Sequence, residues 1–196
     1  QTKRTINVNG RLIDLSTPKI MGILNVTPDS FYAGSRKETE ADITARIEQI
    51  LTEGADIIDI GAYSSRPNAI PVTTEEESTR LRRGLEIIRK TTSDVIVSVD
   101  TFRADVAAMC VEEYNAAIIN DISGGQMDKQ MFNTVARLNV PYIMMHMKGT
   151  PQNMQHNPSY NNLRTEIMQY FAERIQILHS RGVKDIIIDP GFGFGK

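Results

Sequence analysis

Residues 95–100 read VIVSVD, a short apolar run that ends in a carboxylate. A continuous run such as Val95-Ile96-Val97 is typical of a strand that is buried on both faces. Five further runs share this form, and four of them also end in Asn or Asp: KIMGILN (19–25), ADIID (55–59), AAIIN (116–120), PYIMMHM (141–147) and DIIID (185–189). Segments with helical periodicity separate the runs. Since strands that are joined through helices run parallel, the sequence predicts repeated βα units.

Parallel βα units form either a doubly wound sheet or a (β/α)8 barrel, and the residues that share a face of each strand distinguish the two folds. Counting back every second residue from the terminal polar group gives the residues that share its face: Ile23 and Met21 with Asn25, Ile57 with Asp59, Ser98 and Ile96 with Asp100, Ile118 with Asn120, and Ile187 with Asp189. Each such face is capped by a polar residue, as in a barrel whose active site lies at the carboxyl ends of its strands. The G-x-G-x-x-G fingerprint of a doubly wound dinucleotide-binding sheet is missing after the first strand. We therefore expect an α/β fold of the (β/α)8 TIM-barrel type.

The extent of this barrel follows from a count of its strands. Residues 4–15 alternate around Asn9-Gly10, a dipeptide that favours a type I′ turn, so a β-hairpin is expected before the first buried strand. A barrel needs eight strands and about 250 residues, but this chain has 196 residues. We expect residues 1–196 to form one barrel domain with the hairpin and about six βα units, truncated before the last two strands. Because two edge strands would be open, we expect such a piece alone to aggregate or to fold poorly.

The helix boundaries carry signals of their own. Thr74 with Glu77 reads as a capping box at the start of a helix, and Gly54 and Gly182 stand where helices should stop. Apolar residues at helical spacing, such as those between positions 43 and 51, predict helices that lie against the sheet. The chain is thus expected to alternate strand and helix without a linker.

Composition excludes several classes of protein. The chain is 40% hydrophobic and 23% charged with a formal net charge of -2, which fits a globular domain and indicates no nucleic-acid partner. No apolar stretch reaches the roughly 20 residues of a membrane span, and no signal-like segment opens the chain. The single cysteine, Cys110, is expected in the core, and its isolation is typical of a reducing cytoplasm. The three histidines lack zinc-ligand spacing, and His146 is expected to pack against neighbouring side chains.

The polar residues at the strand ends form the candidate site. Each one alone has a plain structural interpretation, because Asx side chains cap turns and helices. Five at the same position among six strands, all on the inward face, are harder to explain this way, since a buried carboxylate without a partner is costly. We therefore expect a ligand that donates several hydrogen bonds. Any metal at such oxygens would be a hard ion such as Mg²⁺.

Two long segments after strands, residues 27–36 and 62–69, are rich in turn residues. Such loops at the carboxyl end of a barrel commonly build lids and anion sites, and their Ser, Thr and Arg groups could surround a diphosphate. The alternative is an ordinary surface loop. The glycines of GFGFGK, residues 191–196, fail the phosphate-loop spacing and are expected to let the backbone approach a flat ligand.

Six motifs together resemble the dihydropteroate synthase family of pterin-binding barrels. They are MGILNVTPDSF (21–31), DIIDIGAYSSRPNA (56–69), SVDTFR (98–103), NDISGG (120–125), MHMKGTPQNMQ (145–155) and DPGFGFGK (189–196). The resemblance runs from about Ile20 to Lys196 and is highly specific. It implies a transferase of folate biosynthesis, the target of sulfonamides. Such an enzyme joins 6-hydroxymethyl-7,8-dihydropterin diphosphate to 4-aminobenzoate with Mg²⁺ and releases diphosphate. It also implies a homodimer for the full-length protein.

The resemblance assigns roles to individual residues. Asp59 and Asp100 would be catalytic and would also hold the pterin. The remaining pterin-binding residues would be Asn120, Ile122, Met145 and Asp189, with Ile122 and Met145 walling the flat ring. Asn25 would coordinate Mg²⁺ with the diphosphate. The aminobenzoate subsite would comprise Phe31, Ser65, Arg66, Pro67 and Phe194.

The chain departs from the family pattern in one loop. Where the family commonly has Gly-Glu-Ser-Thr-Arg-Pro-Gly, residues 62–68 read Ala-Tyr-Ser-Ser-Arg-Pro-Asn. The family's later Ser-Arg-Lys and Arg-x-His motifs are expected beyond Lys196. Two alternatives remain open from the sequence: a pterin-dependent methyltransferase of the corrinoid type, and a non-catalytic pterin-binding module.

Overall fold

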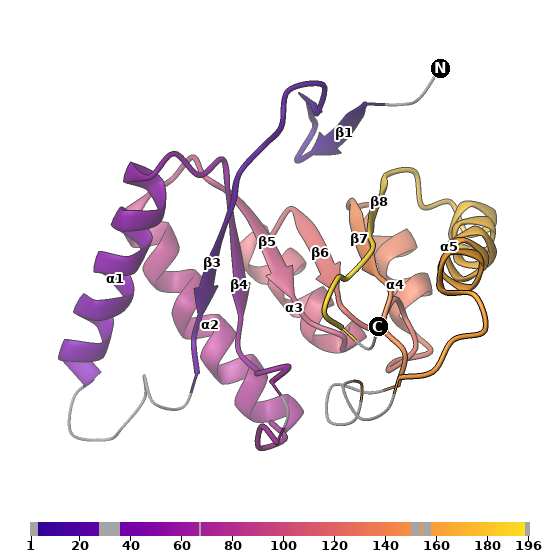
Figure 1. The fold of residues 1–196 in the computed structure, drawn as a ribbon. Coiled ribbons are helices and arrows are strands. Elements are labelled where there is room, and N and C mark those ends of the chain that lie inside the picture. The colour runs from indigo at the N-terminus through magenta and orange to yellow at the C-terminus, as the bar shows by residue number, and fades with distance from the viewer. Residues whose placement is uncertain (1–3, 28–35, 67, 150–153, 155–157, 195–196) are drawn as a thin grey trace.

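Six parallel strands in chain order form the centre of the protein (Figure 1). The computed structural model describes residues 4–27, 36–66, 68–149, 154 and 158–194. The six strands are β3 (Met21–Asn25), β4 (Ile57–Gly61), β5 (Ile96–Asp100), β6 (Ile118–Asp121), β7 (Tyr142–Met145) and β8 (Ile186–Asp189). The helices in the described ranges are α1 (Arg36–Thr52), α2 (Thr74–Thr91), α3 (Ala104–Tyr114), α4 (Met131–Leu138) and α5 (Leu163–Ser180). Each helix follows one strand and precedes the next, so the predicted βα alternation is confirmed.

A hairpin of β1 (Thr5–Val8) and β2 (Arg11–Asp14) lies at the amino ends of the six strands (Figure 1). Its turn residues Asn9 and Gly10 have φ of 50° and 80°, as a type I′ turn requires. The backbone N–H of Asn7 donates to Oδ2 of Asp185, just before β8, at 2.6 Å. The hairpin predicted from the sequence is therefore confirmed, and it is tied to the far strand of the sheet.

The inner face of the sheet packs on this hairpin. Ile6 and Val8 of β1 are buried against Ile57, Ile118 and Ile143. The inward positions of the remaining strands pack against the same cluster through Met21, Ile96 and Ile187. Met21, Ile57, Ile96, Ile118 and Ile187, which the sequence assigned to the inner face, thus share one apolar cluster, whereas Ile23, assigned to the same face, is 56% exposed. The hairpin closes the amino end of the curved sheet and leaves the carboxyl ends available.

The outer face of the sheet packs on the helices in a larger core. Cys110 is fully buried there, as expected of a core cysteine. Close approach of helix and strand explains one glycine: a β-carbon on Gly84 of α2 would lie 2.5 Å from Cδ1 of Ile60 in β4. None of the helices in the described ranges combines the length and the apolarity that a membrane crossing requires.

The capping box of α2 differs from the prediction by one residue. Thr73 is the N-cap; its Oγ1 accepts from the N–H of Glu76, and Glu76 accepts from the N–H of Thr73, each at 3.2 Å. The sequence Thr-Thr-Glu-Glu-Glu offers the same motif in two frames, and Thr74 is the first helical residue instead. Gly54 and Gly182 follow α1 and α5 with φ near 90°, so the predicted stops are confirmed.

Candidate functional site

The polar strand ends lie on three successive rows of the strand pairing. Asn25, Asp100 and Asn120 share one row, because Asn25 pairs with Gly61, Gly61 with Asp100 and Asp100 with Asn120. Asp59 lies two residues before this row, opposite Ile23 and Ser98. Asp189, opposite Met145, lies two residues after it. The sequence placed all five at one position, whereas strand register in a curved sheet is staggered.

Asp59 is the most deeply buried of these groups, with 5% of its surface exposed. Its Oδ2 accepts a hydrogen bond from Nδ2 of Asn120 at 3.2 Å. Its Oδ1 is buried and has no hydrogen bond of normal distance and angle in the described ranges, although the buried hydroxyl of Ser98, opposite Asp59 in the strand pairing, is near enough to lower its pKa. Burial raises the pKa of Asp59 from 3.8 to about 6. A buried carboxylate oxygen without a donor is costly, so it indicates a place for a hydrogen-bond donor from a ligand.

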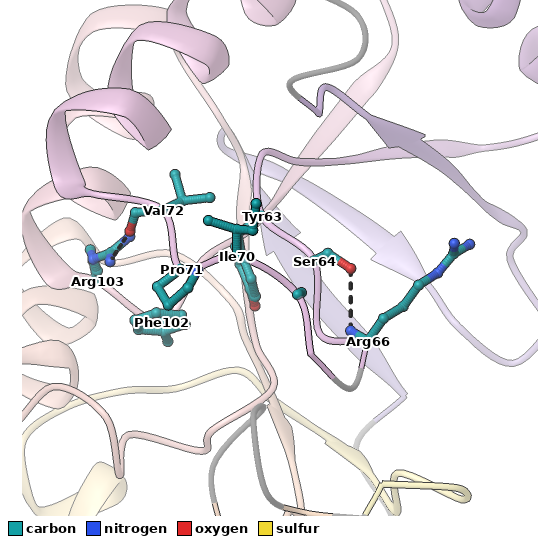
Figure 2. Close-up of a pocket in the computed structure, with 9 residues that line it drawn as sticks. Tyr63, Ser64, Arg66, Ile70, Pro71, Val72, Phe102 and Arg103 are labelled. Carbon is teal, nitrogen blue, oxygen red and sulfur yellow. Dashed lines mark hydrogen bonds between the residues drawn. The ribbon is translucent and has the colours of Figure 1, made fainter.

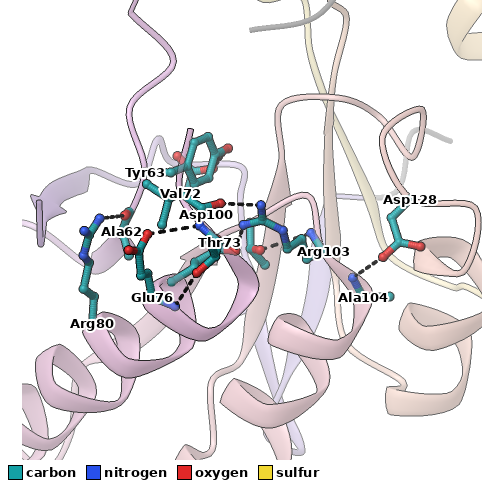
Figure 3. Close-up of polar contacts among 12 residues, drawn as sticks. Ala62, Tyr63, Val72, Thr73, Glu76, Arg80, Asp100, Arg103, Ala104 and Asp128 are labelled. Atoms are coloured by element: carbon teal, nitrogen blue, oxygen red, sulfur yellow. Dashed lines mark hydrogen bonds and ion pairs between the residues drawn. The ribbon is translucent and has the colours of Figure 1, made fainter. Parts of the chain in front are cut away.

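Asp100 is half-buried and is held by Tyr63. The Tyr63 hydroxyl donates to Oδ1 of Asp100 at 2.7 Å (Figure 3). Burial raises the pKa of Asp100 well above its usual range, and the nearby charge of Asp59 raises it further. The Asp100 side chain lies beside its register partner Gly61, where a β-carbon would make an ordinary contact with it at 3.4 Å.

Asp121, next to Asn120, was not singled out from the sequence. It is fully buried and accepts from the N–H and Oγ of Ser123, the N–H of Gly125 and the hydroxyl of Tyr142, the last at 2.6 Å. Both of its oxygens are thus used in shaping the turn after β6. The signal that could have found it is the short Asp-x-Ser-Gly-Gly run, which favours an Asx turn.

The turn that follows Asp189 lies against Met145 and His146 at the end of β7. Oδ1 of Asp189 accepts from the N–H of Gly191 at 2.8 Å, so this oxygen serves the turn. A β-carbon on Gly191 would lie 2.5 Å from the carbonyl oxygen of His146 and 2.7 Å from Cγ of Met145. The sequence predicted that these glycines let the backbone approach a ligand. At Gly191, however, the backbone closely approaches other parts of the protein. Gly193 has open space beside it.

An apolar cluster brings together the residues predicted to wall the ring. Ile122 and Met145 are buried in it with Met147 and Met154. Tyr63 and Phe194 are partly buried against the same cluster. His146 faces away from this cluster and packs edge-on against the ring of Tyr170, with centroids 4.7 Å apart. The predicted packing role of this histidine is confirmed.

The loop after β4 forms a small pocket with the loop after β5 (Figure 2). Ser64 Oγ accepts from the N–H of Arg66 at 3.2 Å, and Arg66 is exposed while Ser65 is half-buried. Asn25 is also exposed, at the end of β3. The pocket is lined by Tyr63, Ser64, Arg66, Ala69, Ile70, Pro71, Val72, Phe102 and Arg103. Of the residues predicted for the aminobenzoate subsite, Phe31 and Pro67 lie outside the described residues.

Arg103 braces the two loops, a role that the sequence did not reveal. Its guanidinium donates to Oε1 of Glu77 at 2.7 Å and to the carbonyl of Val72 at 2.6 Å (Figure 3). Glu77 is fully buried at the start of α2, and burial raises its pKa. Arg80 holds the other end of the loop by donating to the carbonyl of Ala62 at 3.2 Å. The loop after β4 is therefore fixed at both ends.

These groups favour one kind of ligand. Asp59, Asp100 and Asn120 present hydrogen-bonding groups beside an apolar wall, which suits a flat ring with several N–H donors. No cluster of three or more metal-ligating His, Cys, Asp or Glu side chains occurs within the ranges that the structure describes. A cation here would therefore depend on amide oxygens such as that of Asn25 and on oxygens of the ligand.

Known proteins share both the sequence and the fold. Residues 21–196 match the family model described as pterin binding enzyme. A folate synthesis bifunctional protein from Arabidopsis thaliana is 39% identical over 99% of this chain, which spans 41% of that protein. The chain thus spans less than half the length of the curated relatives that it matches first.

Solved structures agree with this match. The dihydropteroate synthase of Xanthomonas albilineans with 4-aminobenzoic acid superposes with a TM-score of 0.85 at 36% identity, covering 100% of this chain and 69% of that one. The Burkholderia cenocepacia enzyme complexed with 7,8-dihydropteroate gives 0.80 at 35% identity, covering 98% and 65%. The curved six-stranded sheet therefore corresponds to part of the TIM barrel of these enzymes, and the chain belongs to the pterin-binding enzyme family.

Proposed function

We propose that the full-length protein is a dihydropteroate synthase. It would join 6-hydroxymethyl-7,8-dihydropterin diphosphate to 4-aminobenzoate. The bond between the exocyclic methylene carbon and the diphosphate oxygen breaks, a carbon–nitrogen bond forms to the amine, and the amine loses one proton. The observation that carries the proposal is Oδ1 of Asp59, a buried oxygen without a donor from the described residues, at the carboxyl ends of the strands. Relatives whose structures hold 4-aminobenzoic acid and 7,8-dihydropteroate support it.

The pterin would be held by the acceptors of the strand ends. Asp59, Asp100 and Asn120 would contact the ring nitrogens, and Asp189 would accept from the amino-pyrimidine edge through the oxygen that the Gly191 N–H does not use. Ile122 and Met145 would lie against the flat faces of the ring, as their shared apolar cluster permits. The aminobenzoate would lie among Phe31, Ser65, Arg66, Pro67 and Phe194.

The charges of the site suit a dissociative substitution. When the carbon–oxygen bond breaks, positive charge spreads into the pterin ring. Asp59 is buried, so its negative charge would act on that ring with little screening by water, and Asp100 would contact the ring beside it. Because the pKa of Asp59 is about 6, this carboxylate is mostly ionised at pH 7.5. The aromatic amine is already neutral at this pH and needs little help from a base.

We also propose a Mg²⁺ ion between Asn25 and the diphosphate. The exposed amide of Asn25 at the carboxyl end of β3 offers an oxygen of the type that Mg²⁺ prefers, and this ion commonly keeps waters and substrate phosphate as its other ligands. The chemistry supplied by the metal would be neutralisation of negative charge on the leaving diphosphate.

Three features of the whole protein complete the proposal. Residues 1–196 would belong to one barrel domain of a homodimer. The lone buried Cys110 supports a reducing compartment such as the cytoplasm. Size-exclusion chromatography with light scattering would test the dimer, which a monomeric mass at micromolar concentration would exclude.

The activity is tested with the full-length protein and both substrates. We expect 7,8-dihydropteroate to form with release of one diphosphate per turnover, and Asp100→Ala to lower kcat/KM by at least about a hundredfold, as loss of one electrostatic contact in a site typically does. Asp94→Ala, an exposed carboxylate before β5, is the matched control and should leave the rate unchanged. Absence of product, or full activity of Asp100→Ala, would refute the assignment. Methyl transfer to a corrinoid partner, or pterin binding without turnover, would identify one of the two alternatives.

A further inference from the structure

Tyr63 contacts both a carboxylate of the site, Asp100, and the apolar cluster that contains Ile122 and Met145. Its hydroxyl donates to Oδ1 of Asp100 at 2.7 Å. Its ring packs edge-on against Phe102, with centroids 5.1 Å apart, and is partly buried against the cluster of Ile122 and Met145. Tyr63 therefore contacts both a carboxylate and the apolar cluster of the site.

The bond to Tyr63 uses one oxygen of Asp100 and leaves the other to a ligand. Oδ2 of Asp100 accepts no hydrogen bond from the ranges that the structure describes, and it lies 3.5 Å from the position that a β-carbon on Gly61 would take. Asp100 is thus held by a donor at Oδ1, and its Oδ2 is left without a hydrogen-bond donor from the described ranges. The carboxylate has a defined orientation before any ligand arrives.

Hydrogen bonds from two arginines fix the loop that carries Tyr63, and so they hold its hydroxyl in place to donate to Asp100. Arg80 donates to the carbonyl of Ala62, the residue before Tyr63. Arg103 donates to the carbonyl of Val72 and to the buried carboxylate of Glu77, which hold the far end of the loop. These contacts lie outside the ring-binding groups and constrain the loop independently of a ligand.

Tyr63 stands at one of the positions where this chain departs from its family's motif, which commonly has Glu there. An ionised glutamate could not donate to Asp100 and would repel it, whereas a phenol donates without adding charge. Burial raises the pKa of Asp100, and the negative charges of Asp59, Asp121 and Glu77 raise it further. The hydrogen bond from the Tyr63 hydroxyl acts in the opposite direction, because it favours the ionised form of Asp100.

Resting on the proposed function, we propose that Tyr63 is a positioning residue for pterin binding, which holds Oδ1 of Asp100 so that Oδ2 faces the ring nitrogens. A hydrogen bond from a neutral donor to a carboxylate is stronger than one between neutral groups. Its loss should therefore weaken the pterin complex measurably, although Tyr63 itself need not contact the reacting atoms.

The test compares Tyr63→Phe with Tyr114→Phe in the full-length protein. Tyr114 also donates to a carboxylate, Oε1 of Glu86 at 3.1 Å, but on the exposed surface away from the site, so it is a matched control. We expect Tyr63→Phe to raise the Kd for the pterin diphosphate substrate roughly tenfold by calorimetry. The KM for the aminobenzoate substrate should change less than about twofold, because the hydroxyl acts on the pterin carboxylate. Tyr114→Phe should alter neither value.

A double-mutant cycle separates positioning from general damage. In an Asp100→Ala background, adding Tyr63→Phe should change the pterin Kd by less than about twofold, because the hydroxyl would no longer have an acceptor on residue 100. An unchanged Kd in Tyr63→Phe, an equal weakening of both substrates with a lowered Tm, or a full effect in the Asp100→Ala background would each overturn the inference. A wild-type protein that makes no dihydropteroate would overturn the proposed function instead, however Tyr63→Phe behaves.

Discussion

Replacing Asp59 by Asn should stabilise the protein while removing pterin binding. Burial raises the pKa of Asp59 from 3.8 to about 6, so the folded state binds this proton more tightly than the unfolded state. The stability that comes with the protonated form is fully present below pH 3.8 and is lost as the pH rises through about 6. The difference of about 2 pKa units corresponds to a cost of ~3 kcal/mol at pH 7.5 and roughly half of that at pH 5. Asn carries no charge and can still accept from Nδ2 of Asn120.

The assay is urea unfolding of the full-length wild type and Asp59→Asn at both pH values. We expect the variant to be more stable by about 2 to 3 kcal/mol at pH 7.5 and by about half as much at pH 5, with an unchanged denaturant slope. Asp94→Asn, an exposed carboxylate, should show no such dependence on pH. A variant that is less stable than wild type at pH 7.5, or a gain that is equal at both pH values, would show that Asp59 is not a strained buried carboxylate.

Four further substitutions test the fold around the site by urea unfolding. Asp121→Asn should destabilise the protein by about 2 kcal/mol or more, because its carboxylate accepts four hydrogen bonds and an amide would turn a donor toward one of these donors; an unchanged midpoint would contradict this. Thr73→Ala should cost about 1 kcal/mol and Thr74→Ala much less, because Thr73 is the N-cap; the reverse order would restore the capping frame expected from the sequence. Ile6→Ala should lower the free energy of unfolding by about 2 to 4 kcal/mol, because it leaves a cavity between the hairpin and the inner face of the sheet. A loss below about 1 kcal/mol would mean that the hairpin does not pack tightly on this face.

Much of the fold could be predicted because strand periodicity is a local property. Two-residue alternation assigned Ile57, Ile118 and Ile187 to the inner face, and all three pack on the hairpin. The same alternation assigned Asp59 and Asp100 inward, where burial raises the pKa of both. These predictions needed no knowledge of which strands are neighbours.

The rest depends on contacts between distant residues. The stagger of Asp59 and Asp189 against Asp100 follows from strand register, which alternation within one strand does not determine. The hydrogen bond from Tyr63 to Asp100 joins residues 37 positions apart. The capping box was assigned one residue late because two overlapping frames have the same letters, and only the backbone geometry of Thr73 distinguishes them.

The central claim is that the acceptors at the strand ends bind a pterin ring. It is tested most directly by a crystal structure of the full-length protein with 6-hydroxymethyl-7,8-dihydropterin diphosphate. We predict ring N–H groups within hydrogen-bond distance of Oδ1 of Asp59 and Oδ2 of Asp100, with Ile122 and Met145 against the ring. A pterin bound elsewhere, or one that leaves Oδ1 of Asp59 still without a donor, would contradict the account.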